Sequence, residues 1–243
     1  MTFTDSLSPA RPLLQLIMVR CQVRTGVFRK LAACRRQSVM INFRWEWGEQ
    51  LPVWVWEGAA MAEVTTLGTL TAERALDRTD LVAAPVAEAL AAWPAADRVV
   101  VAPIDPELAD TAAFCAAYAV APEASANCVV VAGKRAGEQR WAAAVILATT
   151  RADVNGAIRR RLDVRKLSFA PMADAVRLTG MEYGGITPIG VPPDWPVLVD
   201  AAVVAAGPVV IGSGIRGSKI LLDGALLADL PGAEVIEGLA VPV

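Results

Sequence analysis

The sequence predicts an α+β domain built on a mixed, mostly antiparallel β-sheet with flanking helices. Three observations support this fold class. Short helical patterns alternate with short runs of β-branched residues along most of the chain. The segments between these runs are too short for the helical crossovers that parallel strands require. One glycine-flanked turn, residues 133–137, joins two apolar runs and is typical of a β-hairpin.

The first predicted elements lie between residues 72 and 120. Apolar residues recur at helical spacing over 72–92, and we expect Pro85 to divide this segment into two short helices. Residues 98–102 form a short β-branched strand. Residues 106–120 are predicted to be a helix that is entered through Asp105.

The middle of the chain predicts the hairpin and a helix. The hairpin strands are expected at residues 127–132 and 141–149. Thr150 and Asp153 are candidate caps of a helix that runs to about Leu162.

The C-terminal third predicts one more helix and three strands. Pro171 suits the first turn of the helix, and Gly180 suits its C-terminal end. The strands are expected at residues 197–199, 209–211 and 219–222.

Residues 1–60 differ in composition from residues 61–243. The first segment holds eight Lys/Arg, four Asp/Glu and four of the seven tryptophans, whereas the rest holds 15 basic and 21 acidic residues. Three interpretations are open: a start codon assigned too early, with Met61 as the true start; a poorly ordered extension; or a targeting segment. We expect residues 61–243 to form the domain, and its fold to survive deletion of residues 1–60.

Composition excludes several classes of function. No run of about 18 uncharged apolar residues occurs, so the sequence predicts no membrane span. The four cysteines lack C-x-x-C spacing, which is typical of a reduced, cytoplasmic protein. The chain has no histidine, which excludes Ser-His-Asp and Cys-His catalytic sets and histidine-ligated metal sites. We expect no cofactor and no metal, and chemistry that uses backbone donors, charged side chains or the substrate itself.

The most informative segment is Met181–Gly190, which contains three glycines and a proline. Gly184 and Gly185 can adopt positive φ and expose bare backbone N–H groups, and Pro188 stiffens the exit. Such a loop suits close approach of a ligand carbonyl or phosphate to main-chain donors. The alternative is a tight connection between a helix and a strand.

This loop resembles the glycine-x-x-x-proline loop of the YbaK/ProX family of aminoacyl-tRNA editing domains, which also occur within or beside prolyl-tRNA synthetases. Further motifs follow in the family's order from about residue 70 to the C-terminus: Ala126–Val131, Trp141–Asn155, Leu162–Lys166, Pro171–Gly180, Pro196–Asp200 and Gly212–Gly217. The resemblance implies that the sheet is curled into a pseudo-barrel. It also implies a deacylase that cleaves the ester of a mischarged tRNA.

The resemblance also implies how the ester is handled. Backbone N–H groups of Gly184, Gly185 and Ile186 would polarise the ester carbonyl. The nucleophile is the substrate's own ribose hydroxyl or a bound water, since substrate assistance needs no protein base. Thr187, before Pro188, either donates to the substrate or caps the turn.

One residue departs from the family pattern. Asn127 stands where the best-studied members carry a lysine that is thought to hold the substrate or the terminal phosphate. Asparagine keeps a donor and an acceptor but lacks the positive charge. Three outcomes are open: a different aminoacyl ester, a substitute cation such as Lys219 or Arg216, or lost activity. A structural alternative is that Asn127 bonds its own turn.

Further residues are candidates for binding the substrate. Arg216, in the glycine-rich segment 212–217, would face phosphate or lie exposed in a turn. Asp200 is expected to bond a loop backbone or an arginine more readily than to act as a base. Phe169 and Met172 are expected to line the amino-acid pocket. The predicted substrate-binding set is Phe169, Met172, Asp200, Gly214, Arg216, Gly217 and Lys219.

The densest basic cluster after residue 61 lies at residues 159–166. It predicts contact with the acceptor stem of tRNA, through Arg151, Arg159, Arg160, Arg165 and Lys166. The alternative is a solvated helix face whose cations favour the helix C-terminus. Because residues 61–243 carry more acidic than basic side chains, we expect contact with tRNA to be limited to this cluster and to be transient.

Two classes of function therefore compete. In the first, the protein is a deacylase that acts in trans, because the sequence carries no synthetase domain; association with a synthetase and the oligomeric state are open. In the second, the domain is catalytically degenerate and binds an aminoacyl or nucleotide group. A stable domain used for protein contacts is a third option.

Overall fold

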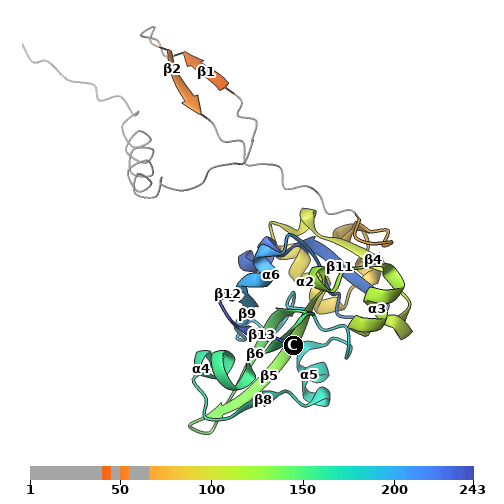
Figure 1. Ribbon diagram of the computed structural model, residues 1–243, viewed down its shortest axis with the longest axis vertical. Helices are drawn as coiled ribbons and strands as arrows, with labels where there is room; N and C mark the ends of the chain where they lie inside the picture. Colours follow the sequence, from red (N-terminus) through yellow and green to blue (C-terminus); the bar gives the residue numbers. More distant parts are fainter. Residues whose placement is uncertain (1–39, 45–49, 55–65) are drawn as a thin grey trace, which may run out of the picture. The chain divides into compact units, whose positions relative to one another are not determined.

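The structure is a computed structural model that describes residues 40–44, 50–54 and 66–243 (Figure 1). The chain divides into two units, residues 1–61 and 62–243. In the first unit, β1 (Met40–Arg44) pairs with β2 (Gln50–Trp54) in antiparallel fashion. The rest of the predicted extension, residues 1–60, lies outside the described residues, so its status stays a prediction.

Two larger sheets and one strand pair form the second unit. The first sheet, in the order β10–β11–β4–β3, contains β3 (Glu73–Arg74), β4 (Val100–Pro103), β10 (Pro208–Gly212) and β11 (Ser218–Asp223). The second, in the order β12–β9–β6–β5–β8, contains β5 (Ala126–Arg135), β6 (Glu138–Leu147), β8 (Leu167–Phe169), β9 (Val197–Asp200) and β12 (Ala233–Ile236). The separate pair consists of β7 (Thr150–Ala152) and β13 (Ala240–Pro242).

Most strand pairs are antiparallel, as predicted, and β9 is the strand that runs parallel to its neighbours β6 and β12. An isolated bridge between Ser125 and Val210 connects the two larger sheets. Within residues 66–243 the strands form separate sheets. The mixed α+β class is therefore confirmed, whereas the curled pseudo-barrel is not found.

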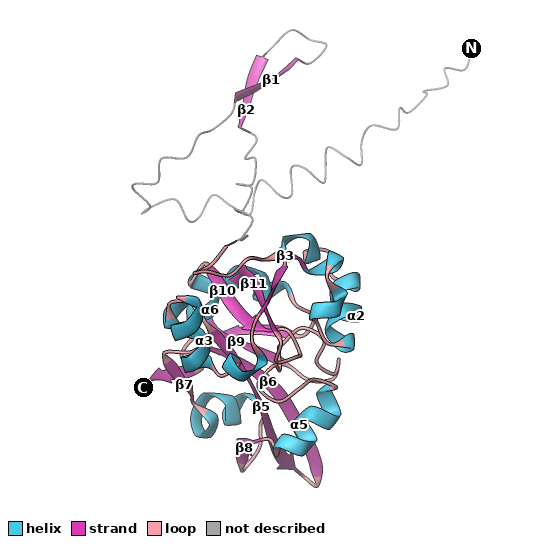
Figure 2. Cartoon of the chain, turned by 90° about the vertical axis from the view of Figure 1, so that its right-hand side faces the viewer, coloured by secondary structure: helices cyan, strands magenta, loops and turns pink. Residues whose placement is uncertain are grey.

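Short helices and turns connect these strands. The helices are α2 (Ala84–Ala92), α3 (Thr111–Tyr118), α4 (Arg159–Arg161), α5 (Met172–Thr179) and α6 (Ala201–Ala205). Tighter turns occur at η1 (Ala75–Asp77), η2 (Thr79–Leu81), η3 (Ala96–Arg98), η4 (Pro106–Leu108), η5 (Pro122–Ala124) and η7 (Gly224–Asp229), and η6 (Val154–Ile158) is a π-helical turn. Figure 1 shows α4 and α5 on opposite sides of the long β5–β6 hairpin, and Figure 2 shows the sheet of β10 and β11 beside one end of this hairpin.

Three predicted helices differ in extent, for local reasons. Pro85 lies in the first turn of α2, so it starts the helix and does not divide it. The helix expected at 106–120 is interrupted at Asp110, whose ψ of 136° is extended, and it becomes η4 followed by α3. Asp153 is confirmed as a cap, because its carboxylate accepts from two N–H groups of η6, but Thr150 belongs to β7.

The predicted hairpin and C-terminal strands are confirmed. The β5–β6 turn places Ala136 and Gly137 at φ of 51° and 89°, which suits a two-residue hairpin turn. Gly180, at φ 66°, ends α5 as predicted. No helix in the described part of the chain is long and apolar enough to cross a membrane.

The largest core cluster lies between α2 and the two larger sheets. Val86 and Leu90 of α2 are buried against side chains of both sheets, including Val101, Val145, Val199, Ile211 and Ile220. Because one cluster joins α2, β4 and β6 to β10 and β11, the relative position of the two sheets is fixed by apolar packing. The site described next depends on this packing.

Candidate functional site

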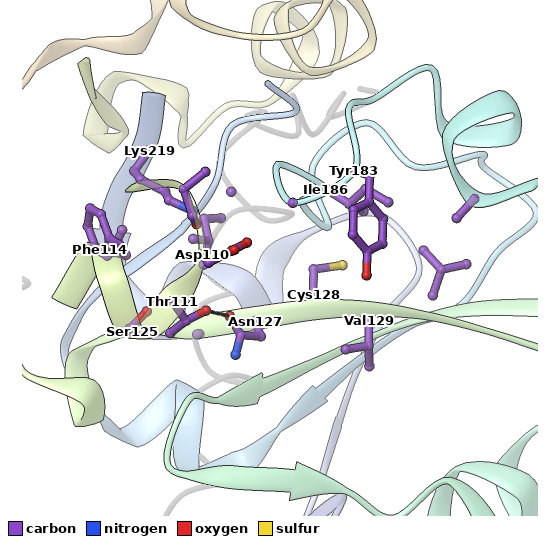
Figure 3. Close-up of a pocket in the computed structure, with 18 of the residues that line it drawn as sticks. Asp110, Thr111, Phe114, Ser125, Asn127, Cys128, Val129, Tyr183, Ile186 and Lys219 are labelled. Atoms are coloured by element: carbon purple, nitrogen blue, oxygen red, sulfur yellow. Dashed lines mark hydrogen bonds between the residues drawn. The ribbon is translucent and has the colours of Figure 1, made fainter. Parts of the chain in front are cut away.

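A cavity of about 360 Å³ lies where the two larger sheets of the second unit meet (Figure 3). Its walls come from the start of α3, from β5, from the end of β8, from α5, from the loop after α5, and from β10 and β11. The volume is near the lower end of the range of about 300–1,000 Å³ that is common for small-molecule sites. Six predicted site residues line it: Asn127, Phe169, Met172, Gly184, Ile186 and Lys219.

Two glycine-rich loops are joined by hydrogen bonds at the edge of this cavity. The N–H of Glu182 donates to the carbonyl of Gly214 at 2.8 Å, and the N–H of Gly214 donates to the carbonyl of Gly185 at 2.7 Å. The Glu182 carboxylate also accepts from the N–H of Arg216 at 2.7 Å. A β-carbon at Gly212 would overlap the carbonyl oxygen of Gly185. The loops are therefore held by backbone contacts that larger residues would disrupt.

The three predicted N–H donors differ in availability. The N–H of Gly185 donates to the carbonyl of Glu182 at 3.0 Å, so it is already used within the turn. The N–H groups of Gly184 and Ile186 donate to no described residue, and both residues line the cavity. Gly184 has a φ of +87°, a conformation that residues with a β-carbon rarely adopt. The structure thus leaves two of the three donors available to a ligand.

Thr187 and Pro188 do not line this cavity. Both residues are buried. Thr187 Oγ1 has no hydrogen-bond partner among the described residues. Neither role predicted for Thr187, donation to a substrate in the cavity or capping of the turn, is found.

Lys219 on β11 brings a positive charge to the inner part of the cavity. Its side chain is only 8 % exposed, and its Nζ donates to the carbonyl of Ala109 at 3.0 Å. The ammonium also lies 5.3 Å from the ring centroid of Phe114. Among the described residues it forms no ion pair, since Asp110 lies instead 3.9 Å from Arg216 Nη1. Burial lowers the pKa of Lys219, and the charge of Arg216 lowers it further.

Asn127 on β5 is linked to the start of α3. Its Oδ1 accepts from Thr111 Oγ1 at 2.8 Å (Figure 3). Its amide nitrogen donates to no described residue, and Figure 3 shows this nitrogen on the side of β5 opposite to Cys128 and Tyr183. The bond to its own turn, which was the structural alternative, is not found.

Cys128, the next residue along β5, also lines the cavity. Desolvation raises the pKa of its thiol to about 12. The sulfur therefore stays protonated at neutral pH and is a poor nucleophile. Within the described residues, no group of three or more potential metal ligands lies together.

The other predicted substrate-binding residues do not line the cavity: Asp200, Gly214, Arg216 and Gly217. Asp200 accepts from the N–H groups of Ala202 and Ala240, each at 2.8 Å, which agrees with the predicted structural role. Arg216 donates to the carbonyl of Pro106 at 2.9 Å, and its Nη1 would be 2.6 Å from a β-carbon at Gly184. Arg216 thus packs against the loop and supports it from behind.

Phe169 and Met172 line the cavity, but at its exposed mouth. Their side chains are 57 % and 56 % exposed, and Tyr183 beside them is 59 % exposed. The enclosed wall is formed by smaller buried residues, among them Ala126, Val130 and Ala175. Phe169 and Met172 thus line the cavity, and their contact with the amino acid stays a prediction.

Three of the predicted tRNA-binding residues line a second, open cavity of about 600 Å³. These are Arg159, Arg165 and Lys166, and no carboxylate lies in its wall. Leu167 and Ser168 of β8 line this basic groove, whereas Phe169, the last residue of the same strand, lines the first cavity. The groove and the first cavity therefore share one short strand, β8, the groove at its first two residues and the cavity at its last. Arg160 and Arg151 are exposed but do not line the groove.

Sequence reasoning missed three contributors to the site. Thr111 was noted only as a polar position of a helix, although its hydroxyl positions Asn127. Glu182 and Tyr183 lie inside the loop Met181–Gly190. The signal that could have identified them is their position, as a charged and an aromatic residue directly before two glycines. Their partners, however, come from segments far away in the sequence.

Comparison with known proteins agrees with this geometry. The sequence profile of the aminoacyl-tRNA editing domain matches residues 105–230. The solved structure of a proposed trans-editing enzyme for prolyl tRNA synthetase is similar, with 20 % identity, a TM-score of 0.55, and coverage of 63 % of this chain and 93 % of that one. A scaffold used for epitope backbone grafting by computational design matches with 20 % identity, a TM-score of 0.55, and coverage of 64 % and 95 %.

No curated protein sequence matches the chain. At these identities the two solved structures support the fold alone. The family profile, however, covers just over half of the 243 residues and includes all the cavity walls described above. The chain therefore belongs to the family of aminoacyl-tRNA editing domains, as its resemblance to the YbaK/ProX proteins indicated.

Proposed function

We propose that residues 62–243 form a trans-acting deacylase that hydrolyses the ester of a mischarged tRNA. One observation carries this proposal. The buried ammonium of Lys219 lies in the same cavity as Gly184 and Ile186, whose N–H groups donate to no described residue. Negative charge develops on the carbonyl oxygen of an ester as a nucleophile adds to it, and preorganised donors of this kind stabilise that charge.

In the proposed reaction, water attacks the carbonyl carbon of the ester. The bond from this carbon to the ribose oxygen then breaks, the ribose oxygen takes up a proton, and the products are a free amino acid and deacylated tRNA. The chain has no histidine, and the Cys128 thiol is protonated. The adjacent ribose hydroxyl of the substrate is therefore the group that we propose orients the water.

Lys219 answers the question raised by Asn127. It supplies a positive charge to the cavity from β11, whereas the relatives' lysine would occupy the position of Asn127 on β5. Asn127 lines the same cavity, and Thr111 holds its side-chain oxygen. We propose that Lys219 faces the ester oxygens and that Asn127 orients the substrate by a neutral hydrogen bond.

The basic groove beside β8 supports contact with tRNA. Arg159, Arg165 and Lys166 line a groove that shares β8 with the cavity, and we propose that backbone phosphates of the tRNA contact them. Arg151 and Arg160 would extend this contact along the surface. Association with a synthetase and a cytoplasmic location stay predictions that belong to this proposal.

The rival function is a degenerate module that binds an aminoacyl or nucleotide group without cleaving it. The observation in its favour is Asn127, whose neutral side chain is already bonded to Thr111. Under this alternative the cavity keeps its shape, but the charge on Lys219 alone does not support catalysis.

A deacylation assay with the full chain separates the two functions. Wild type, Asn127→Ala and Asn127→Lys would be tested against a panel of mischarged tRNAs, with circular dichroism to verify folding. We expect wild type to hydrolyse one or a few of the esters, and both variants to be slower or to change substrate. No hydrolysis by folded wild type, or activity that appears only in Asn127→Lys, would contradict the deacylase and support the degenerate module.

A further inference from the structure

Three large apolar side chains surround the mouth of the cavity, and each is more than half exposed. Phe169, Met172 and Tyr183 are 57 %, 56 % and 59 % exposed, and all three line the same opening. They come from three separate segments: the end of β8, the first residue of α5 and the loop after α5. Exposed apolar side chains that gather at one place indicate a binding surface, whereas single ones do not.

The exposure of Phe169 does not follow from its strand alone. Residues two apart on a strand share a face, so Phe169 and Leu167 of β8 point the same way. Leu167 is buried in a core cluster, whereas Phe169 is uncovered. The core cluster that buries Leu167 therefore does not cover Phe169, which lines the cavity and stays more than half exposed.

The mouth and the buried charge lie on opposite sides of the cavity. Figure 3 shows the ring of Tyr183 on the far side from Lys219, reaching from the loop toward β5. Exposure changes in the same direction, from 8 % at Lys219 to 59 % at Tyr183. A substrate bound with its ester near Lys219 would thus extend outward past the three apolar side chains.

We propose that Phe169, Met172 and Tyr183 form a stacking platform for the terminal base of the tRNA. This inference rests on the proposed function. A nucleobase has two flat apolar faces, and exposed aromatic rings are the usual partners of unstacked bases. The competing occupant is the side chain of the amino acid, but the small residues Ala126, Val130 and Ala175 of the enclosed wall suit that group better.

The order of sites along the chain agrees with this assignment. Phe169 ends the strand whose first two residues line the basic groove. A base on the platform would therefore lie outside its own ester, which is inside the cavity, and the tRNA backbone would have to pass β8 to reach the groove.

The test compares a substrate that carries the base with one that lacks it. Tyr183→Ala, Tyr183→Phe and the control Val235→Ala would be assayed on the aminoacyl-tRNA that wild type hydrolyses and on the 3′-O-aminoacyl ester of ribose with the same amino acid, which keeps the assisting hydroxyl and lacks the base. Val235 is 47 % exposed on β12 and does not line the cavity. Stacking contributes about 1–3 kcal/mol per base, so Tyr183→Ala should reduce kcat/KM on aminoacyl-tRNA by about 5- to 150-fold. Tyr183→Phe should retain most activity, and the loss in Tyr183→Ala should be much smaller on the ribose ester, which carries no base, than on aminoacyl-tRNA.

Two results would overturn the platform. One is an equal loss on both substrates, which would show that the mouth holds the amino acid; the other is no loss on aminoacyl-tRNA. A second measurement does not depend on hydrolysis: adenosine and ribose are titrated into wild type and Tyr183→Ala and followed by NMR. Adenosine should bind more tightly than ribose, and only to wild type. Equal binding by both proteins, or none, would refute the platform even if the deacylase proposal failed separately.

Discussion

The glycine-rich cavity and the basic groove are neighbours on β8, but they are built differently. The cavity combines residues from α3, β5, β10, β11 and the loop 181–190, and hydrogen bonds between backbone groups hold its two loops together. The groove comes from the single segment 155–168, and its Arg165 and Lys166 side chains are exposed to solvent.

This difference indicates how each region tolerates change. In the cavity, a β-carbon at Gly212 or Gly185 would overlap backbone atoms, so small substitutions displace donors. In the groove, the long Arg and Lys side chains are solvated and attract a phosphate through the solvent. Replacing one of them removes a positive charge and leaves the backbone of the groove in place. We therefore expect substitutions in the cavity to lower kcat strongly. Substitutions in the groove should raise KM slightly, by an amount that depends on salt concentration.

The largest effect is expected from Gly184→Ala. A β-carbon there would be 2.6 Å from Arg216 Nη1 and would strain a residue at φ +87°. The Arg216 side chain can move away, but the strain at this left-handed position would turn the Gly184 N–H, and misplacing one preorganised donor typically lowers kcat by about 10²-fold or more. Deacylation kinetics on the preferred aminoacyl-tRNA would measure this loss.

Gly137→Ala is the matched control for this prediction. Gly137 has a φ of +89°, and a β-carbon there would meet nothing within 4 Å. Both variants should lose about 1–2 kcal/mol of unfolding free energy from the left-handed backbone, but only Gly184→Ala should lose activity. Similar activity in the two variants would show that the cavity does not depend on this loop.

An intermediate effect is expected from Lys219→Met, which keeps the length of the side chain and removes its charge. A hydrogen bond to a charged group contributes about 1.5–3 kcal/mol, so kcat/KM should fall about 10- to 150-fold. Unfolding free energy should change little, because losing the bond to Ala109 is offset by removing a buried, unpaired charge. A large loss of stability with unchanged activity would assign Lys219 to the core.

The pH dependence of Lys219 tests the same assignment. Burial and Arg216 lower its pKa from 10.5, and only the protonated amine attracts an ester oxygen. Activity above the spontaneous rate should therefore decline at alkaline pH, at a value below 10.5. The folded state favours the neutral amine, so stability should rise with pH between the lowered folded pKa and the unfolded one. Lys219→Met should lack both changes, and retaining them would attribute them to another group.

The sequence was enough to predict the site where its residues are adjacent in the chain. The loop Met181–Gly190 and the hairpin at 133–137 depend on glycine and proline conformations, which are local properties. The family resemblance then supplied the order of the elements. By contrast, the curled sheet was an inference from the family and is not found, because pairing between strands depends on long-range packing.

Contacts between distant residues account for what the sequence could not provide. Thr111 bonds Asn127 across 16 residues, and Lys219 bonds Ala109 across 110. The residues next to Lys219 in the sequence do not indicate whether its side chain is buried or lies on the surface. The exposure of Phe169 was equally hidden, because its apolar character alone predicts burial.

The smallest effect is expected from removing two cations of the groove. The double variant Arg165→Ala/Lys166→Ala should raise KM for aminoacyl-tRNA by about two- to thirtyfold, since exposed charge contacts contribute about 0.2–1 kcal/mol each. kcat should be unchanged, because the ester and the loop are not touched. The slope of log(kcat/KM) against log salt should become less steep by about one for each cation that contacts phosphate.

The contrast with the cavity is sharpest on a substrate without RNA. Hydrolysis of the 3′-O-aminoacyl ester of ribose should be the same in the double variant as in wild type, whereas Gly184→Ala should be impaired on both substrates. Arg98→Ala, which removes an arginine beside β4 and outside the groove, is the control for general loss of charge. If the slope of log(kcat/KM) against log salt is unchanged in the double variant, the tRNA does not contact this groove. If kcat falls in the double variant, the groove residues also affect the reaction in the cavity.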